Sequence, residues 1–271
     1  MVKITEQPSV HRNLQLKSIA EITALINQED KKVSEAILAS LPKINQLIGV
    51  IVQKINSGGR MFYLGAGSGG RLSVLDAIEL PTTFGVPKEL VQVILAGGKD
   101  KLVEALEQME DDTESGWMML QQKNVCEKDI IIGITASGST PFVVEALKKC
   151  RSNGIFSACI TSNTGSEVSK HADIAVEVIT GPEFITGSTR MKCGTAQKMI
   201  FDMISTTVMI QLGRVIDNRM VNVSLINNKI TDRAVKMLME MGKIEDYQQA
   251  KEKLFRYGSV KEALEHVNNM D

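Results

Sequence analysis

Five short apolar segments, separated by helical patterns, restrict the fold of this chain more than any other feature of its 271 residues. The predicted strands cover residues 60–64, 91–95, 129–134, 156–160 and 174–178. Strands that alternate with helices at this spacing are typical of crossover connections between parallel strands. The strands are near-continuous apolar runs, as expected where helices cover both faces of a sheet. The sequence therefore predicts an α/β domain with a central parallel sheet.

Helical periodicity places helices before, between and after these strands. Two amphipathic helices are predicted at the N-terminus, and the glycines at 58 and 59 end the second one. The helix after the first strand is expected to stop at Pro81, because proline lacks the main-chain N–H that a helix interior needs. The main predicted helices cover residues 14–29, 31–56, 100–109, 112–122, 141–153 and 188–213.

The strand signals stop after about residue 217, and only helical patterns follow. Ser259 and Glu262 form a capping box at the start of the last of these helices. A length prior of about 150 residues per domain is compatible with one large domain and a small appendage. We therefore expect a first domain over residues 1–216 and a small C-terminal subdomain over residues 217–271. Its three short helices are predicted at 227–241, 244–254 and 259–268.

The charge balance argues against two classes of partner. The chain has 31 Lys and Arg against 32 Asp and Glu, a formal net charge of -1 and a pI of about 6.4. Such a chain lacks the basic footprint of a nucleic-acid-binding protein and the basic face of a membrane-surface protein. The start MVKITEQPSVHR has no apolar core of a secretory signal, and no run approaches the roughly 18 apolar residues of a membrane span. We expect a cytoplasmic protein with no nucleic-acid or membrane partner.

Cysteine and histidine usage does not favour a metal centre. The four cysteines form no CxxC pair, so buried reduced thiols are expected, and the three histidines are far apart with no HExxH motif. These residues are Cys126, Cys150, Cys159 and Cys193, and His11, His171 and His266. The sequence therefore predicts no metal site.

Two of the predicted strands end in a loop of Gly, Ser and Thr that opens a helix. These loops are Leu64-Gly-Ala-Gly-Ser-Gly-Gly-Arg71 and Ile134-Thr-Ala-Ser-Gly-Ser-Thr-Pro141. Small residues let main-chain N–H groups approach a ligand, and a helix N-terminus adds partial positive charge. Ligands of open α/β sheets bind outside the carboxyl ends of the strands, where both loops are expected. The pattern favours a phosphomonoester, and an ordinary turn between strand and helix remains the alternative for each loop taken alone.

The first loop also contains GxGxxG, so a dinucleotide site is an alternative. That fingerprint expects an acidic residue about 20 positions on, at the end of the next strand. Here the strand ends in Ala96-Gly-Gly98, and no ribose-binding carboxylate is evident. The pattern GxxxxGK[ST] of P-loop proteins is absent, so neither nucleotide site is favoured.

A third polar segment, Gly181-Pro-Glu-Phe-Ile-Thr-Gly-Ser-Thr-Arg-Met-Lys-Cys-Gly194, leads into the long helix. Arg190 and Lys192 fall in its first turn, where cations oppose the helix dipole. We expect either an anionic ligand or a carboxylate such as Glu183 to compensate them. A salt-bridged solvent face is the alternative.

These loops, together with LDAIELPTTFG and GPEFITGSTRMKCGTAQK, resemble the N-acetylmuramic acid 6-phosphate etherases of the sugar isomerase (SIS) superfamily. The resemblance begins at Thr5-Glu-Gln7 and covers nearly the whole chain. Glucokinase regulatory protein shares the GPE…GSTRMK…GTAQK signature. The resemblance implies a three-layer αβα sandwich with a central parallel sheet, N-terminal helices and a small C-terminal helical subdomain. It also implies a homodimer that needs no metal or organic cofactor.

The same resemblance implies an activity and its residues. The family cleaves the D-lactyl ether of its phosphosugar substrate during cell-wall recycling. Its catalytic acid falls on Glu79 within Asp76-Ala-Ile-Glu-Leu-Pro-Thr-Thr-Phe-Gly85, and a second catalytic glutamate falls on Glu110. Apolar neighbours are expected to keep Glu79 protonated as the acid, and Glu110 is expected to act as the base. The expected substrate-binding residues are Gly67, Ser68, Gly69, Arg71, Ser137, Gly138, Ser139, Thr140, Glu183, Ser188 and Thr189.

The sequence departs from the family pattern at three positions. Gly69 replaces a serine of the first loop, Ile78 replaces a serine beside the presumed acid, and Thr82 replaces a proline. These changes bear on substrate and activity more than on fold. Two other functions therefore stay open: a non-catalytic phosphosugar-binding regulator and an aldose–ketose phosphosugar isomerase.

Overall fold

The computed structural model describes residues 3–98, 102–103 and 107–268. The chain forms two compact units, one of residues 1–77 and 89–204 and the other of residues 78–88 and 205–271. Helices α2 (Gly67–Phe84) and α6 (Lys192–Gln211) continue across the boundaries between these ranges. The predicted division at residues 216 and 217 lies inside the second unit, and residues 78–88 were not expected to belong there.

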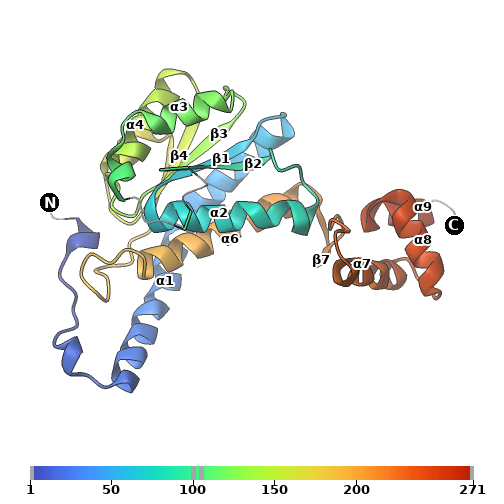
Figure 1. The fold of residues 1–271 in the computed structure, drawn as a ribbon, viewed down its shortest axis with the longest axis horizontal. Coiled ribbons are helices and arrows are strands. Elements are labelled where there is room, and N and C mark those ends of the chain that lie inside the picture. Colours follow the sequence, from blue (N-terminus) through green and yellow to red (C-terminus); the bar gives the residue numbers. More distant parts are fainter. Residues whose placement is uncertain (1–2, 99–101, 104–106, 269–271) are drawn as a thin grey trace. The chain divides into compact units, whose positions relative to one another are not determined.

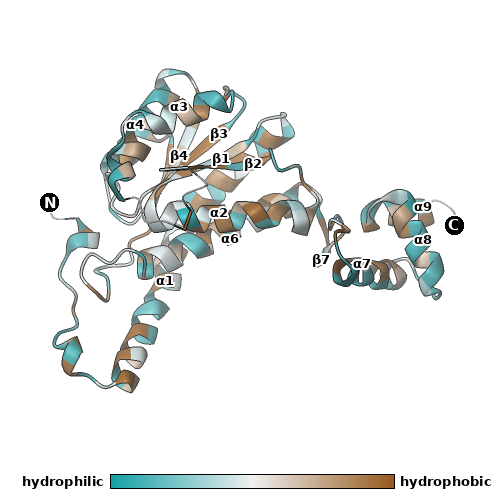
Figure 2. Cartoon of the chain, viewed as in Figure 1, coloured by the Kyte–Doolittle hydropathy of each residue, from teal (hydrophilic) through white to brown (hydrophobic). Residues whose placement is uncertain are grey.

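The first unit contains a five-stranded sheet in the order β2-β1-β3-β4-β5, with every pair parallel. The strands are β1 (Met61–Gly65), β2 (Val91–Leu95), β3 (Ile130–Ile134), β4 (Phe156–Thr161) and β5 (Ile174–Glu177). The predicted parallel α/β sheet is confirmed, and each strand begins and ends within one residue of its prediction. The hydrophobic colouring of the central strands in Figure 2 shows why helices must cover both faces.

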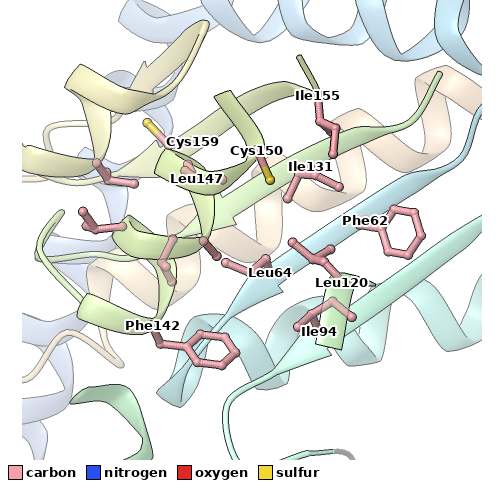
Figure 3. Packing of buried hydrophobic residues seen from close by; sticks show 14 residues of the cluster. Phe62, Leu64, Ile94, Leu120, Ile131, Phe142, Leu147, Cys150, Ile155 and Cys159 are labelled. Atoms are coloured by element: carbon pink, nitrogen blue, oxygen red, sulfur yellow. The ribbon is translucent and has the colours of Figure 1, made fainter. Parts of the chain in front are cut away.

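Helices form a layer on each side of this sheet (Figure 1). Helices α3 (Ser115–Gln122) and α4 (Pro141–Ser152) cover one face, with the short α5 (Glu167–His171) packed on α4. Figure 3 shows Phe62 and Leu64 of β1 in one buried cluster with Leu120 of α3 and Phe142 of α4. Tyr63 points the opposite way and contacts Phe201 of α6, as alternation along a strand requires. The fold is thus the expected three-layer sandwich.

Helix α1 (Ile19–Asn56) is one helix of 38 residues, and the prediction of two helices that meet near residue 30 was wrong. Ser18 and Glu21 form a capping box at its start. The sequence has acidic residues at 29 and 30, a pattern that suggests a polar break. The structure instead buries Glu29 against other elements, so the helix continues through it.

By length and composition alone, α1 would be able to cross a membrane, and it is the one described helix of which this is true. Its buried positions include Val33, Ile37, Ile44 and Leu47, and the helix packs on β5. This stripe is typical of the core helix of a folded α/β unit.

The second unit contains a small helical core. Helices α7 (Asn228–Met241), α8 (Tyr247–Tyr257) and α9 (Val260–Asn268) confirm the three predicted helices. Their buried cluster includes Val235, Leu238 and Leu254. A short hairpin of β6 (Val215–Ile216) and β7 (Arg219–Met220) was not predicted, because two-residue strands leave no periodicity to detect.

The sequence predicts that α2 stops at Pro81, but the helix continues to Phe84. Within the second unit the Pro81 carbonyl accepts hydrogen bonds from Gly85 N at 3.1 Å and from the Ser224 hydroxyl at 2.8 Å. These contacts hold the last turn in place although proline donates no hydrogen bond of its own.

Other differences are local. Helix α6 begins at Lys192, four residues later than predicted, because the preceding residues form turns. The predicted helix over 100–109 lies partly outside the described residues, and residues Glu107–Asp111 form the 3-10 helix η4. The 3-10 helices η1 (Ile4–Glu6) and η2 (Leu14–Leu16) precede α1.

Candidate functional site

The two Gly/Ser loops meet at one cavity of about 170 Å³ at the carboxyl end of the sheet. Because β1 and β3 are adjacent parallel strands, the loops that follow them open side by side. Seven of the predicted site residues line this cavity: Gly67, Ser68, Gly69, Glu110, Ser137, Thr140 and Thr189. A larger, shallow depression of about 700 Å³ contains none of them and is lined by residues such as Trp117 and Cys126.

Gly67 places the first loop directly beneath Glu110. Its φ is +54°, in the left-handed region that favours glycine. A Cβ atom at this position would lie 2.6 Å from Oε1 of Glu110. Glycine is therefore required at this position for two reasons: the backbone conformation and the close approach of the carboxyl group.

Glu110, on η4, is the one predicted catalytic residue that lines the cavity. Its side chain is half-buried, and burial raises its pKa above the ordinary value of 4.5. The negative charge of Glu107 adds to this rise in pKa, and Arg71 opposes it. A carboxyl group with a raised pKa can exchange a proton closer to neutral pH, as acid–base chemistry requires.

The second loop presents a network of hydroxyl groups. The Thr135 and Thr140 hydroxyls are 2.8 Å apart, and the Ser137 hydroxyl lies 3.3 Å from that of Thr135. Thr140 precedes α4, and its side chain does not cap the helix. Hydroxyls at a helix N-terminus are suited to a phosphate group.

Gly138 has a structural role within this loop. Its φ is +72°, and a Cβ atom would lie 2.3 Å from the side chain of Ser166. Its N–H bonds to the Thr135 hydroxyl at 3.1 Å. Gly138 therefore shapes the loop without lining the cavity.

The N-terminal segment closes part of the same site, which was not predicted. Glu6 lines the cavity, and Lys3 Nζ donates to the Ser139 hydroxyl at 2.5 Å. The Asn163 side chain fixes the segment: its Oδ1 accepts from Ile4 N at 2.6 Å and its Nδ2 donates to the Thr5 hydroxyl at 3.1 Å. The one feature of the sequence that pointed to this segment is Thr5-Glu-Gln7, where the family resemblance begins, and that feature alone predicts no function for it.

The third polar segment contributes Gly187 and Thr189 to the cavity, and Ser188 does not line it. Glu183 is buried away from the lining, and its carboxylate accepts the N–H groups of Lys192 and Cys193 at 2.9 Å each. It therefore caps the start of α6 rather than compensating the Lys192 ammonium.

The ammonium of Lys192 instead bonds to Glu29 of α1 at 2.6 Å, with both side chains buried. His11 and Lys32 also contact Glu29, at 3.1 and 2.6 Å. Burial alone would raise the pKa of Glu29, but these hydrogen bonds outweigh burial and lower it to about 2. The cation of the α6 first turn is thus compensated within the protein.

Gln197 of α6 also lines the cavity and was missed, although it belongs to the quoted GTAQK segment. Arg71 lies outside the lining, with its Nε donating to the Leu102 carbonyl at 3.3 Å, and acts on Glu110 through its charge. Glu79 and Ile78 are exposed on the part of α2 that belongs to the second unit. The role of Glu79 therefore stays a prediction from its motif.

Three buried cysteines, Cys150, Cys159 and Cys193, are free thiols, and Cys126 is exposed. Burial raises the pKa of each buried thiol to about 12, so none is a nucleophile. Among the described residues no cluster of three or more His, Cys, Asp or Glu has the arrangement of a metal site.

Comparisons with solved structures support the fold. A phosphoheptose isomerase from Francisella tularensis superposes with a TM-score of 0.54 at 17% identity, covering 74% of this chain and 100% of that one. A phosphoheptose isomerase from Neisseria gonorrhoeae gives a TM-score of 0.52 at 16% identity, over 70% and 97% of the two chains.

Sequence comparisons identify the family as well as the fold. Residues 43–151 match the glucokinase regulatory protein N-terminal SIS domain family, and residues 107–207 match the SIS domain family. An N-acetylmuramic acid 6-phosphate etherase of Porphyromonas gingivalis is 51% identical over 98% of this chain and 96% of its own length. One from Bacteroides thetaiotaomicron is 49% identical over 97% and 95%. With its parallel sheet, its paired loops and this identity over nearly its full length, the chain belongs to the N-acetylmuramic acid 6-phosphate etherase family.

Proposed function

We propose that this chain is a carbon–oxygen lyase that cleaves the D-lactyl ether of N-acetylmuramic acid 6-phosphate. The products are N-acetylglucosamine 6-phosphate and D-lactate, in the recycling of cell-wall sugars. Full-length relatives at about half identity bear the name of this etherase. The observation that carries the proposal is Glu110, a half-buried carboxyl with a raised pKa, facing two hydroxyl-rich loops across one cavity.

The chemistry needs one base and one acid. Opening of the pyranose exposes an aldehyde at C1, which acidifies the proton on C2. A base removes that proton, the electron pair forms a C2–C3 double bond, and the C3–oxygen bond breaks as an acid protonates the departing lactyl oxygen. Water then adds its hydroxyl to C3 and a proton to C2, and the ring recloses. Each proton transfer is worth roughly 10²–10⁴ in rate.

Glu110 is assigned the base that removes the C2 proton and later activates water. Its raised pKa makes its carboxylate a stronger base than an exposed glutamate. Its position over Gly67 places it beside the N-terminus of α2. The same raised pKa would suit an acid, and the pH dependence of the two glutamate variants separates the roles.

Glu79 is assigned the acid that protonates the ether oxygen. This assignment rests on the resemblance of Asp76–Gly85 to the family motif and on the family membership of the chain. Ile78 and Thr82, which differ from the motif, lie beside it. The effect of Glu79→Gln on lactate release is therefore the most direct test of the motif.

The phosphate is assigned to the N-termini of α2 and α4. Ser68, Ser137 and Thr140 supply hydroxyl donors there, and the helix dipoles favour the anion. No net positive side chain is needed for such a site. Thr189 adds a hydroxyl from the third segment.

We also propose a cytoplasmic homodimer. Helix α1 leaves Ile19 at 82% and Leu38 at 66% exposure, in addition to its buried stripe. Large apolar side chains left exposed on a helix favour an interface with another copy. Sedimentation equilibrium that finds a monomer at micromolar concentration would overturn this part of the proposal.

The test is a coupled assay of D-lactate release from N-acetylmuramic acid 6-phosphate, with Glu79→Gln, Glu110→Gln and the neighbouring Asp111→Asn as a control. We expect release by the unmodified chain and a fall of at least about a hundredfold in each glutamate variant. Asp111→Asn should retain most of the activity, since Asp111 is exposed and does not line the cavity.

Other outcomes identify the alternatives. Absence of lactate release, with a melting temperature raised by N-acetylglucosamine 6-phosphate, would indicate a phosphosugar-binding regulator. The match of residues 43–151 to the glucokinase regulatory protein domain makes this the second candidate. Conversion of an aldose phosphate to a ketose phosphate without lactate release would indicate an isomerase.

A further inference from the structure

Gln197 lies in the second turn of α6 and faces the cavity that contains Glu110. Its side chain is only 3% exposed, yet it is part of the cavity lining. Neither its position in the sequence nor the motif-derived set of binding residues had given it a role. It is the most deeply buried polar side chain among the lining residues.

No hydrogen bond joins the carboxamide of Gln197 to another described residue, and neither amide atom is among the fully buried polar atoms that lack a partner, so the amide keeps access to the cavity. A glutamine amide offers two donors and an acceptor oxygen with two lone pairs. Buried polar groups are nearly always hydrogen-bonded, and exceptions concentrate where a ligand or water completes the set. The neighbouring buried groups show the contrast: Lys192 bonds to Glu29, and Glu183 caps α6. The Gln197 amide is thus directed at the cavity rather than at the protein.

Gly69 shows where this amide lies. A Cβ atom at Gly69 would be 2.9 Å from Oε1 and 3.2 Å from Nε2 of Gln197. The amide therefore occupies the space beside the first turn of α2, where free main-chain N–H groups attract an anion. In the family pattern a serine stands at this position, and here a side chain would press against both the amide and Ile134.

We propose that Gln197 is a further phosphosugar-binding residue, whose Nε2–H donates a hydrogen bond to a phosphate oxygen at the N-terminus of α2. The inference rests on the proposed function only in taking a phosphosugar as the ligand. It assigns the phosphate a donor from α6, in addition to the hydroxyls of the two loops. Gly69, which has no side chain, leaves the space beside this donor open.

The test compares Gln197→Met, which keeps the length of the side chain but removes the hydrogen-bonding atoms, with Gln197→Glu, which keeps the shape but adds a negative charge. Gln211→Met, at the exposed end of the same helix, is the matched control. Isothermal titration measures binding of N-acetylglucosamine 6-phosphate and of inorganic phosphate to each full-length variant. Thermal melting of each variant without ligand reports whether the fold is retained.

We expect Gln197→Met to weaken binding of both probes roughly tenfold, as for a lost hydrogen bond to a charged group. Gln197→Glu should weaken both further, because its carboxylate would face the phosphate. Gln211→Met should bind both as the unmodified chain does. If Gln197→Met fails to fold, Gln197→Glu carries the same test through its charge.

Three results would overturn the inference: unchanged binding of both probes by the Gln197 variants, weakening for the phosphosugar but not for phosphate, or absence of phosphate binding by the unmodified chain. Failure of the proposed function is recognised separately. A chain that binds N-acetylglucosamine 6-phosphate through Gln197 but releases no D-lactate would refute the lyase and leave this inference standing.

Discussion

Two glutamates of the first unit have opposite electrostatic surroundings. Glu29 of α1 is 4% exposed and contacts Lys192, Lys32 and His11, which together lower its pKa to about 2. Glu110 is half-buried beside the acidic Glu107, and its pKa is raised. Burial alone raises the pKa of both, so the difference arises from the hydrogen bonds that Lys192, Lys32 and His11 make with Glu29.

The comparison separates a structural carboxylate from a chemical one. With a pKa of about 2, Glu29 is ionised at neutral pH, and its hydrogen bond to Lys192 ties α1 to the start of α6. Glu110 makes no such set of contacts and opens onto the cavity. A buried carboxyl near a cavity therefore indicates acid–base chemistry only where its neighbours leave the proton free to exchange.

The largest expected effect breaks the Glu29 cluster. Glu29→Gln leaves the Lys192 ammonium, only 2% exposed, without its carboxylate. We expect the free energy of unfolding to fall by about 3–5 kcal/mol, the usual result of removing one partner of a buried pair. Urea unfolding measures this, with Glu35→Gln at an exposed position of α1 as control. A loss no larger than that of the control would show that Lys192 finds another partner.

The pH dependence of Glu29 gives a second, smaller test. Because its folded pKa lies below the ordinary 4.5, its contribution is present above pH 4.5 and is lost as the pH falls to about 2. The stability difference between the unmodified chain and Glu29→Gln should therefore shrink across this range. Urea unfolding at pH 5, 4 and 3 follows it, and a constant difference would contradict the assigned contacts.

Ionisation of Glu110 should have the opposite effect on stability. Its folded pKa is raised, so its ionisation above that pKa weakens the fold, whereas its protonated form does not. Glu110→Gln should then be slightly more stable than the unmodified chain at pH 7, by less than roughly 1 kcal/mol because solvent screens a half-exposed group. The gain should vanish below pH 4.5. Thermal melting at pH 7 and pH 4 checks both signs, and a loss of stability at pH 7 would refute the electrostatic account.

The smallest expected effect is on the pKa of Glu110 and comes from its neighbour Glu107. Glu107 raises the pKa of Glu110 by charge repulsion, so Glu107→Gln should lower it. The acid limb of the pH profile of kcat/KM for lactate release should move slightly to lower pH, because solvent screens the charge of the exposed Glu107. An unmoved limb would show that another group controls it.

Much of the fold was predictable because its signals are local. The apolar runs of β1–β5 and the glycines and Pro141 at their ends mark strands and helix starts within a few residues. What failed depended on distant partners. Helix α1 continues through Glu29 because Lys192, far away in the sequence, binds that carboxylate. Helix α2 continues past Pro81, whose carbonyl accepts a hydrogen bond from the distant Ser224.

The candidate site divides in the same way. The two loops were visible as strand–loop–helix units, and the structure brings both to one cavity with Glu110. Glu6 and Gln197 were not found, since 190 positions separate them and no spacing rule joins them. Glu79 remains a prediction from its motif.

The sequence by itself determined the parallel sheet, the two loops and the family, because hydrophobic period, turn residues and motif spacing are properties of short segments. Only the tertiary structure decided which glutamate is bound by cations and which faces a cavity with its proton available. Residue type is the same at positions 29 and 110; the local dielectric and the charges within a few ångströms differ, and these arise from elements that meet only after folding.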